Sequence, residues 1–390
     1  MKKFFALALI IFTSISIQAQ NFEDLEFGSD STFEVITWNI EWFPKEGVTT
    51  INYVSNILEA LDADLYALQE ISDTILFKQM LDSLEDYTGY FQSSWFAGLA
   101  YIYKTDEVTI NDIYEIYITS EYWRPFPRSP MVIELSIGDD DFIVINNHFK
   151  CCGDGILDIA DPSDEETRRL DASNLLKEYI DENFTNNKVV LLGDLNDNLA
   201  DSPENNVFQV ILNDSLNYDF VDLEIAYGSS TNWSYPTWPS HLDHICITNE
   251  LFQDFEEDGS VVRTIKLEDY FEGGWWEYET YVSDHRPVAL KVFRNPISGV
   301  NDNLTPNVKF VNYPNPFITS TTIEYELRQP EKVTLTIYDY LGKQVHQVQV
   351  NQAQGSQQIK WNAEGYADGI YYYRLQAGEQ VANGKLVKAR

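Results

Sequence analysis

Residues 189–197 read Val-Val-Leu-Leu-Gly-Asp-Leu-Asn-Asp, a short apolar run that ends in polar side chains. Four apolar residues in succession, bounded by a glycine, are typical of a strand that is buried on both faces. Asp194 and Asn196 follow at the carboxyl end of that strand. In layered α/β domains, strand ends bring residues that are distant in sequence to one edge of the sheet. The stretch therefore predicts both a fold class and the place of a candidate site.

Short apolar strands and amphipathic helices alternate along residues 33–293, which predicts one layered α/β domain. Strands are expected at residues 33–38, 65–69, 131–137, 142–146, 189–192, 241–248 and 288–293, and helices at 51–61, 73–84 and 164–183. Residues 131–146 form one hairpin in this interpretation, because Gly-Asp-Asp-Asp separates the two apolar runs.

Polar side chains recur at or beside the ends of these predicted strands. They are Asn39, Glu70, His148, Asp194, Asn196, Asp243, Asp284 and His285. Several carboxylates with asparagine amide oxygens suit a hard cation such as Mg²⁺, Mn²⁺ or Ca²⁺ rather than a metal held by thiolates. The chain has three cysteines, so at least one stays unpaired even if Cys151 and Cys152 bridge as adjacent residues.

The two ends of the chain differ from this domain. Two lysines, an apolar run over residues 4–12 and a small residue at Ala19 predict a secretory signal peptide over residues 1–19. The catalytic domain is then expected over residues 20–293, with its core at 33–293, and a turn-rich linker over 294–308. Residues 309–390 follow as a small β-sandwich, since at least five short alternating strands lie between residues 321 and 387.

Charge is distributed unevenly along the chain. Lys and Arg number 26 and Asp and Glu 62, which gives a net charge of −36. Residues 307–390 hold nine basic and seven acidic residues, so almost all of the excess lies before them. Such a field repels polyanions at long range, so a nucleic-acid substrate would have to be held by local basic groups and metal. The simpler interpretation is that the acidity keeps an exported protein soluble.

Six short motifs resemble the endonuclease/exonuclease/phosphatase superfamily, which includes pancreatic deoxyribonuclease, apurinic endonucleases, neutral sphingomyelinases and inositol-phosphate phosphatases. The motifs are Thr37-Trp-Asn39-Ile-Glu41-Trp42, Leu68-Gln-Glu70, Asn147-His148, Gly193-Asp194-Leu-Asn196-Asp197, Leu242-Asp243-His244 and Ser283-Asp284-His285-Arg-Pro287. Each alone is weak, but all six follow that family's order. The resemblance implies a four-layer α/β sandwich, with two packed mixed β-sheets flanked by helices.

The resemblance also implies a divalent metal site. Glu70 would bind the metal, which would be Mg²⁺ or Mn²⁺, with Ca²⁺ as a further option. Asn39 would lie beside Glu70, and Asp284 close to the same site. Glu41 stays open between a second metal ligand and a solvated strand end.

The remaining matching positions acquire catalytic roles from the resemblance. His285 would be the general base toward water, and Asp243 would hold its imidazole in the right tautomer. Asp194 and Asn196 would position the phosphate and the attacking water. His148 would hydrogen-bond the phosphate or assist the leaving oxygen. The chemistry is consistent, because a histidine can accept a proton near neutral pH and an adjacent carboxylate can orient it.

Basic residues near these motifs are candidates for substrate binding. Arg128 precedes a predicted strand at a position where relatives often carry arginine, and Lys150 follows His148 closely. We expect these two to bind substrate. Arg168 and Arg169 lie on a helix face, where pairing with nearby glutamates is an equally good explanation. His241 and His244 are interpreted as structural.

The tail resembles the C-terminal sorting domain of the type IX secretion system. The similarity lies in Tyr313-Pro-Asn-Pro-Phe317, Ile337-Tyr-Asp-Tyr-Leu-Gly342, Trp361-Asn362 and Asp368-Gly-Ile-Tyr-Tyr-Tyr-Arg-Leu375. It implies export through an outer-membrane secretion machinery, removal of the tail, and a secreted or cell-surface protein. The alternative is a carbohydrate-binding or immunoglobulin-like accessory module.

The leading functional hypothesis is an extracellular, metal-dependent nuclease that acts on DNA or RNA, and we expect it to be monomeric. A lipid phosphodiesterase similar to sphingomyelinases is the alternative, because Trp275 and Trp276 could form an exposed hairpin tip that enters a membrane interface. Another phosphatase of the superfamily remains open. A non-catalytic surface-binding protein is disfavoured, because no expected catalytic position is missing.

Overall fold

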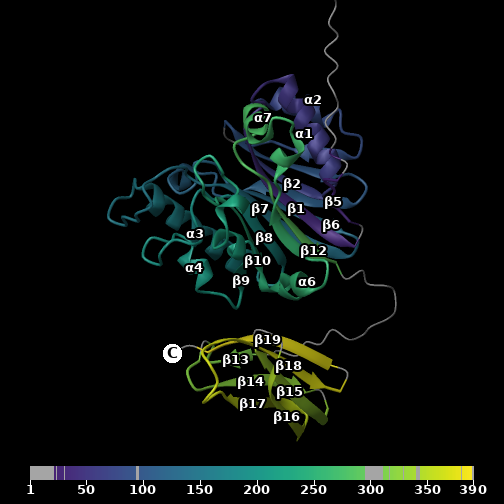
Figure 1. The fold of residues 1–390 in the computed structure, drawn as a ribbon, viewed down its shortest axis with the longest axis vertical. Coiled ribbons are helices and arrows are strands. Elements are labelled where there is room, and N and C mark those ends of the chain that lie inside the picture. The colour runs from purple at the N-terminus through teal and green to yellow at the C-terminus, as the bar shows by residue number, and fades with distance from the viewer. Residues whose placement is uncertain are drawn as a thin grey trace, which may run out of the picture. The chain divides into compact units, whose positions relative to one another are not determined.

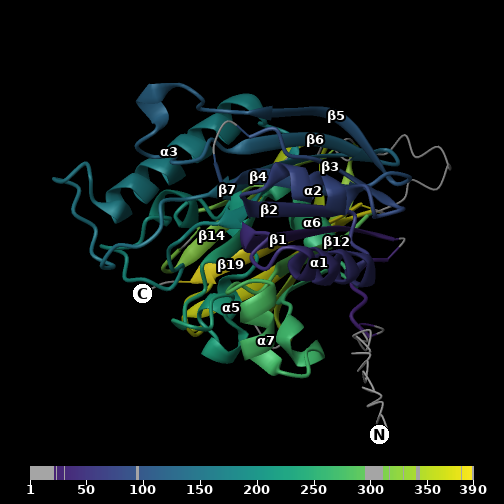
Figure 2. The same ribbon diagram turned by 90° about the horizontal axis from the view of Figure 1, so that it is seen from above.

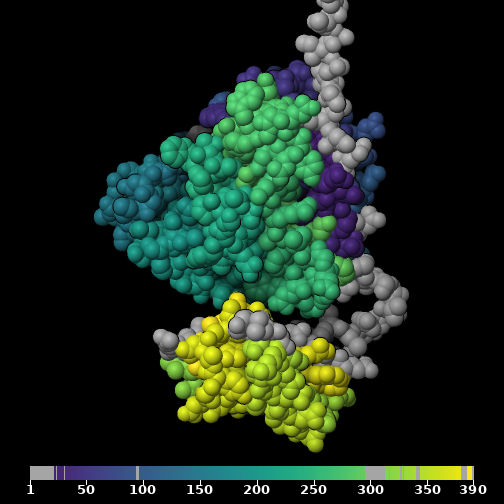
Figure 3. Space-filling model, in the orientation of Figure 1, coloured from purple at the N-terminus to yellow at the C-terminus, as the bar shows by residue number. Residues whose placement is uncertain are grey.

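The computed structural model describes residues 22, 24–29, 31–93 and 96–294, and then residues 311–388 except 316, 328, 340–342 and 379. The chain divides into two compact units, Met1–Ile297 and Ser298–Arg390, which Figure 1 draws as ribbons and Figure 3 as surfaces. The predicted signal peptide lies outside the described residues, as does the predicted linker except for residue 294. None of the described helices is long and apolar enough to cross a membrane.

The first sheet of the N-terminal unit has six strands in the order β11-β12-β1-β2-β4-β3. These are β1 (Thr32–Phe43), β2 (Leu65–Ile71), β3 (Tyr87–Tyr90), β4 (Gly98–Lys104), β11 (Val261–Thr264) and β12 (Val288–Phe293). β1 and β2 run parallel, and the other pairs are antiparallel. The helices packed against its outer face are α1 (Val48–Leu61), α2 (Thr74–Leu81) and α7 (Gly274–Tyr281).

The second sheet also has six strands, in the order β5-β6-β7-β8-β10-β9. These are β5 (Val108–Glu115), β6 (Met131–Ile137), β7 (Asp140–His148), β8 (Lys188–Asp194), β9 (Tyr218–Phe220) and β10 (Asp243–Thr248). Only β7 and β8 run parallel. Its outer face is covered by α3 (Glu165–Asn183), α4 (Gln209–Leu212) and α5 (Leu223–Ala226). The remaining short helices are α6 (Phe252–Glu256), η1 (Ser120–Tyr122), η2 (Ser230–Asn232), η3 (Asn249–Leu251) and η4 (Leu267–Tyr270).

Three apolar clusters fill the spaces between these layers. Along β1, Val35 packs between the two sheets, whereas Ile36 packs under the helices that cover the first sheet. This alternation follows from the two-residue period of a strand, and both residues are fully buried. A third cluster joins the second sheet to α3 through Leu176. Figure 2 shows α3 and α1 on opposite sides of the paired sheets. The predicted four-layer α/β sandwich is confirmed.

Several elements differ from the sequence prediction. The predicted hairpin is β6–β7, and the predicted capping residue Asp73 accepts hydrogen bonds from the backbone N–H groups of Ile75 and Leu76 at the start of α2. The sequence reading did not include β3, β4, β5, β9 or β11. The expected hairpin tip at Trp275 and Trp276 is wrong, because both residues lie in α7. Trp275 packs against the apolar core and only Trp276 is strongly exposed.

The C-terminal unit consists of two antiparallel sheets. The first has the order β13-β14-β17 and the second β16-β15-β18-β19. The strands are β13 (Val311–Tyr313), β14 (Ser320–Leu327), β15 (Glu331–Asp339), β16 (Gln344–Gln352), β17 (Gly355–Asn362), β18 (Gly369–Ala377) and β19 (Gln380–Lys388). Trp361 and Leu335, from different sheets, are both fully buried in the core. The predicted small β-sandwich is confirmed, with β13 and β16 in addition to the expected strands.

Candidate active site

Strand ends from both sheets of the N-terminal unit converge on one edge. Asp194 ends β8 and lies between two neighbours, with His148 of β7 opposite it on one side and Asp243 of β10 on the other. In the first sheet, Asn39 of β1 pairs with the residue before Glu70 of β2. The structure therefore brings five of the predicted site residues together from five different strands.

His285 and Asp243 form a buried pair at the centre of this edge. Nδ1 of His285 lies 2.8 Å from Oδ2 of Asp243. Asp243 is fully buried, and His285 is 6% exposed. Nε2 of His285 faces the opposite way and lies 3.9 Å from carboxylate oxygens of both Asp194 and Asp284. The carboxylate of Asp243 thus fixes the ring, and the second nitrogen points toward the other acidic groups.

The backbone around His285 is held rigidly from β1 and α7. Trp38 Nε1 donates to the carbonyl of His285 over 3.3 Å, and the Tyr278 hydroxyl donates to the same oxygen. The N–H of His285 donates to Ser283 Oγ, and that hydroxyl donates to the carbonyl of Asn39. These bonds tie the segment before β12 directly to the strand that carries Asn39, so the imidazole and the metal-ligand candidates share one frame.

A second set of polar atoms surrounds the Nε2 side of His285. The Asn39 amide donates to Asp194 Oδ2 over 3.0 Å and to Glu70 Oε1 over 3.3 Å, so it bridges the two carboxylates. Nε2 of His148 lies 3.4 Å from Asp194 Oδ2 and 3.8 Å from Glu70 Oε1. Asn196 donates its backbone N–H to Asp194 Oδ1 over 3.2 Å. The imidazole of His148 is 3% exposed.

A local distortion of β1 directs Glu41 into the same region. Glu41 and Trp42 have positive φ angles of 32° and 50°, and the register between β1 and β2 shifts at this point. As a result, the N–H of Trp42 donates to Glu70 Oε2 and the N–H of Asp284 donates to Glu41 Oε2, each over 3.0 Å. Glu41 is therefore a half-buried member of the site rather than a solvated strand end.

Burial and neighbouring charges strongly perturb the pKa values of His285, Asp194 and His148. Burial lowers the pKa of His285, but the negative charges of Asp243 and Asp194 outweigh it and raise the pKa to about 10. Burial raises the pKa of Asp194 to about 7, against the opposing effect of His285. Burial, reinforced by Arg128 and His285, holds the pKa of His148 well below its ordinary value. The site carries more negative than positive charge before any ligand is added.

The residues present fit a hard divalent cation. Glu70, Asp194, Asn39 and Asp284 offer carboxylate and amide oxygens, the ligand type that Mg²⁺, Mn²⁺ and Ca²⁺ prefer. The raised pKa of the buried Asp194 shows that its negative charge is incompletely compensated by protein groups. A cation among these oxygens would supply that compensation.

Comparison with known proteins places this geometry in a family. Residues 36–285 match the model of the Endonuclease/Exonuclease/phosphatase family. The chain belongs to this family. Residues 311–389 match the model of the Secretion system C-terminal sorting domain, so the predicted resemblance of the tail is confirmed as well. No curated protein matches the sequence.

Comparison with solved structures finds proteins that are similar to the family domain. TDP2 of D. rerio, complexed with a single-strand DNA product, is 14% identical with a TM-score of 0.50 and covers 68% of this chain and 100% of its own. The catalytic domain of human Nocturnin with a bound sulfate anion is 17% identical with a TM-score of 0.47, covering 68% and 94%. An endonuclease/exonuclease/phosphatase from Bacteroides vulgatus is 13% identical with a TM-score of 0.47, covering 67% and 98%.

The candidate site opens into a cleft of about 690 Å³. Asn39, Glu70, His148, Asp194, Asn196, Asp284 and His285 all line it. Sequence reasoning did not assign the aromatic residues of its wall, Trp42, Tyr235 and Trp238. The Tyr235 ring lies 4.8 Å from the imidazole of His285, centroid to centroid. Asp197 also lines the cleft, and its place in the Gly193–Asp197 motif was the signal that could have identified it.

The two basic residues expected to bind substrate are engaged by backbone carbonyl groups. Arg128 is half-buried and donates to the carbonyl of Ala97 over 3.1 Å, but its charge reaches His148. Lys150 donates to the carbonyl of Cys151 over 2.9 Å and lies 3.8 Å from Glu165. Neither belongs to the described residues that line the cleft. Their role in substrate binding stays a prediction.

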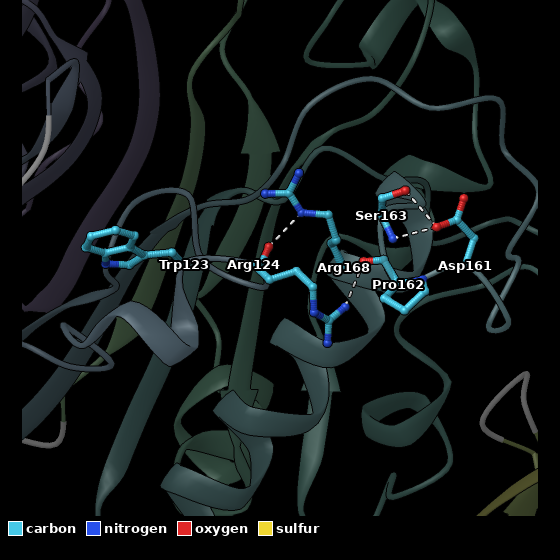
Figure 4. Close-up of a pocket in the computed structure, with 6 residues that line it drawn as sticks. All are labelled: Trp123, Arg124, Asp161, Pro162, Ser163 and Arg168. Atoms are coloured by element: carbon cyan, nitrogen blue, oxygen red, sulfur yellow. Dashed lines mark hydrogen bonds between the residues drawn. The ribbon is translucent and has the colours of Figure 1, made fainter.

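A second pocket of about 510 Å³ lies beside the start of α3, and its lining shares no residue with the candidate site. Figure 4 shows the side chains of Arg124 and Arg168 in it. Arg124 donates to the carbonyl of Pro162 and pairs with Asp171, and Arg168 donates to the carbonyl of Arg124 over 2.6 Å. These contacts give both arginines a structural role in fastening the loop before α3.

Proposed function

We propose that residues 36–285 hydrolyse phosphodiester bonds of nucleic acids outside the cell, with a divalent cation held at Glu70. The observation that supports this most strongly is the orientation of the His285 imidazole. Its Nδ1 is fixed by the buried Asp243, and its Nε2 faces a cleft lined by Asp194, Asn39 and Glu70. Such an arrangement suits a general base that takes a proton from water beside a metal-bound phosphate.

The acidic surroundings control when His285 can act as a base. With a pKa near 10, its imidazole is protonated at neutral pH and cannot accept a further proton. When bound, the cation (Mg²⁺ or Mn²⁺, with Ca²⁺ as a further option) neutralises phosphate charge and, by adding positive charge near His285, lowers that pKa. Asp243 keeps the proton on Nδ1, so that Nε2 is the nitrogen that faces the water.

His148 and Asn196 are the residues that we expect to contact the phosphate. The depressed pKa keeps His148 neutral, and its Nε2, which faces Asp194 and Glu70, can donate a hydrogen bond to a phosphate oxygen or to the leaving oxygen. Asn196 donates its backbone N–H to Asp194, adopts a positive φ of 53°, and lines the cleft. Preorganised donors of this kind stabilise charge that develops on a transferring phosphoryl group.

The cleft wall favours nucleic acid over lipid as substrate. Trp42 and Trp238 are 53% and 74% exposed and both line the cleft. Exposed aromatic rings stack with nucleobases regardless of sequence, which offsets the unfavourable acidic field of the domain. Trp276 is 68% exposed and lies on α7 outside the cleft lining, so it is the residue that a lipid phosphodiesterase would use to reach a membrane.

One set of assays separates these substrates. The purified protein is incubated with Mg²⁺ or Mn²⁺ and with plasmid DNA, single-stranded DNA, RNA, sphingomyelin vesicles or inositol phosphates. We expect nucleic-acid cleavage that EDTA abolishes and that Trp238→Ala weakens, whereas the matched control Trp276→Ala leaves it unchanged. Release of choline phosphate without nucleic-acid cleavage, and its loss in Trp276→Ala, would establish the lipid reaction instead.

We also propose that the tail is an address that is removed after export of a monomeric enzyme. The match of residues 311–389 to the sorting domain supports this. Deleting residues 307–390 should retain the enzyme in the periplasm, and the mature protein in the medium should lack the tail by mass spectrometry. Unchanged export of the truncated chain would rule the proposal out, and gel filtration would test the monomer.

A further inference from the structure

Cys151 and Cys152 are adjacent, exposed thiols in the wall of the catalytic cleft. Their sulfur atoms lie 2.9 Å apart. Consecutive side chains of an extended segment point to opposite sides. Here Cys152 adopts a left-handed φ of 73°, which places both sulfurs on the same side of the loop. An outlier of this kind at a non-glycine residue beside an active site calls for a functional explanation.

The backbone around the two thiols is clamped by a buried arginine. Arg169 donates from Nη1 to the carbonyls of Lys150 and Cys152, over 2.8 and 2.7 Å. Its own charge is held by Asp197 at 2.7 Å and Glu166 at 3.1 Å. Arg169 is 2% exposed. The carbonyls before and after Cys151 are thus fixed while both thiols stay accessible.

Gly153, the next residue, is also closely confined by its neighbours. Gly153 has a φ of 109°, and a Cβ at this position would lie 2.2 Å from Glu166 Oε1. The same carboxylate oxygen accepts a hydrogen bond from Gly155 N–H over 2.7 Å. The loop therefore cannot relax easily into a form that separates the two sulfurs.

We propose that Cys151 and Cys152 are a modification site at which a reversible vicinal disulfide forms in the wall of the catalytic cleft. Export through the sorting domain takes the chain out of the reducing cytoplasm and into surroundings in which disulfides persist. Bridged residues usually have Cα atoms farther apart than neighbours in a chain can be, so this bond is strained and readily reduced. Strained, exposed disulfides are the labile and regulatory ones.

The reaction is an exchange with an external disulfide, such as oxidised glutathione or a thiol–disulfide oxidoreductase. Cys151 gives up its proton, and its thiolate, which lies 3.7 Å from Lys150 Nζ, attacks one sulfur of the oxidant. This breaks the oxidant's disulfide and leaves a mixed disulfide on Cys151. Cys152 then loses its proton and displaces the remaining thiolate. One disulfide is consumed and one is formed, and the oxidant gains two electrons and two protons.

The bond alters the surface that faces substrate. Cys151 and Cys152 follow His148 closely, and Arg169 links their loop through Asp197 to the segment that carries Asn196. A bridge therefore changes a wall of the cleft without touching the metal-ligand candidates. It also withdraws two soft thiolates from a site built for a hard cation, so that the thiols cannot capture zinc or copper.

Thiol counting on the full-length protein tests the proposal. Wild type and the Cys246→Ser variant are equilibrated in glutathione buffers of graded redox ratio, quenched in acid and alkylated, and the peptide with residues 151–152 is analysed by mass spectrometry. We expect both variants to lose two reactive thiols under oxidising conditions, with the peptide two hydrogens lighter. Glutathione alone should restore both thiols in the folded protein.

Single-cysteine variants provide the matched controls. Cys151→Ser and Cys152→Ser should each keep one alkylatable thiol or form a mixed disulfide with glutathione, and neither should give the lighter peptide. Two alkylated thiols in the oxidised wild type would overturn the proposal. So would a disulfide-linked dimer on a non-reducing gel, or a bond that is reduced only after denaturation. None of these readouts depends on catalysis, so they remain valid if the proposed nuclease activity fails.

Discussion

Two groups of the N-terminal unit combine buried histidine and aspartate side chains, and only one of them faces a cleft. Within the described residues, Asp194–Asp243–His285 and Asp222–His241–His244 each bring three donor atoms within 4.8 Å of one another. In the second group, His244 uses both ring nitrogens, Nδ1 at 2.6 Å from Asp222 and Nε2 at 2.8 Å from the carbonyl of Asp197. In the first, Nε2 of His285 lies 3.9 Å from the nearest carboxylates.

The two groups also differ in how well their negative charge is compensated by neighbouring positive groups. Burial raises the pKa of Asp222, but the two histidines outweigh it and hold that pKa below the ordinary value. Asp194, by contrast, has a raised pKa, because burial and neighbouring carboxylates oppose its ionisation. The histidine nitrogens beside Asp222 lie 3.0 and 2.6 Å from its carboxylate oxygen Oδ2, closer than the roughly 3.3 Å between ligands of a tetrahedral zinc ion. A compensated group stabilises the fold, and an uncompensated one can bind a cation.

The largest expected effect is on catalysis at the uncompensated group. His285→Ala should lower kcat by about 10²–10⁴-fold, because the general base is lost. His346→Ala, in the C-terminal unit, is the control and should not change kcat. Steady-state cleavage of the preferred substrate is the measurement. Equal hydrolysis by His285→Ala would remove the assigned base.

The compensated group should instead affect stability. His244→Ala should lower the free energy of unfolding by about 3–5 kcal/mol, because it removes the nearer of the two histidines that pair with the buried Asp222 carboxylate. Urea unfolding measures this loss, and the fraction that stays folded should keep a kcat near wild type. If His244→Ala had normal stability and a large loss of kcat, the Asp222 group would have a catalytic role, which contradicts this assignment.

Cation binding should stabilise the protein through only one of the two groups, and this effect on the free energy of unfolding is smaller than that of His244→Ala. A cation at 100 times its dissociation constant should stabilise the wild type by about 2.7 kcal/mol, measured as a rise in Tm with Mg²⁺ or Mn²⁺. Glu70→Gln should lose this rise, whereas His241→Gln should keep it. If His241→Gln abolished the effect and Glu70→Gln did not, the cation would belong to the other group.

The pH dependence of stability should have opposite signs at the two groups. In EDTA, the folded-state pKa of His285 is raised to about 10, so its contribution is complete below the unfolded pKa of about 6.5 and lost as pH rises toward 10. Asp222 has a lowered pKa, so its contribution is present above about pH 3.9 and lost on acidification. Urea unfolding of wild type and His285→Gln should converge between pH 6.5 and 10. Parallel curves over this range would contradict the assignment.

The sequence predicted the parts of the site that follow regular strands. Asn39, Glu70 and Asp194 follow apolar runs; sheet register brings Asn39 beside the residue before Glu70, and the packing of the two sheets adds Asp194. The position of Glu41 was not predictable, because it depends on a bulge in β1 that no residue pattern announces. Trp238 lies in a turn closed by the pairing of Tyr235 with Ser240, outside the elements that the sequence predicted.

The same limit applied to the fold. Strands with continuous apolar runs, such as β8, were found, whereas β5 was missed because its exposed face carries residues such as Asn111 and Asp112 that favour turns. β16 was missed for a related reason, since glutamines separate its valines. His244 was correctly predicted to be structural, but its hydrogen bonds to Asp222 join segments 22 residues apart in sequence.

The left-handed backbone conformations around the cleft affect which substitutions selection for heat resistance would favour. Eight described non-glycine residues have φ between 32° and 73°, and five of them line the cleft: Glu41, Trp42, Glu70, Cys152 and Asn196. Each such conformation costs about 1–3 kcal/mol. A laboratory selection for heat resistance that ignored activity should therefore replace Glu41, Trp42, Glu70 and Cys152 early, with glycine or asparagine, and Asn196 with glycine. Under selection for both properties they should resist change, and heat resistance would have to evolve elsewhere in the domain.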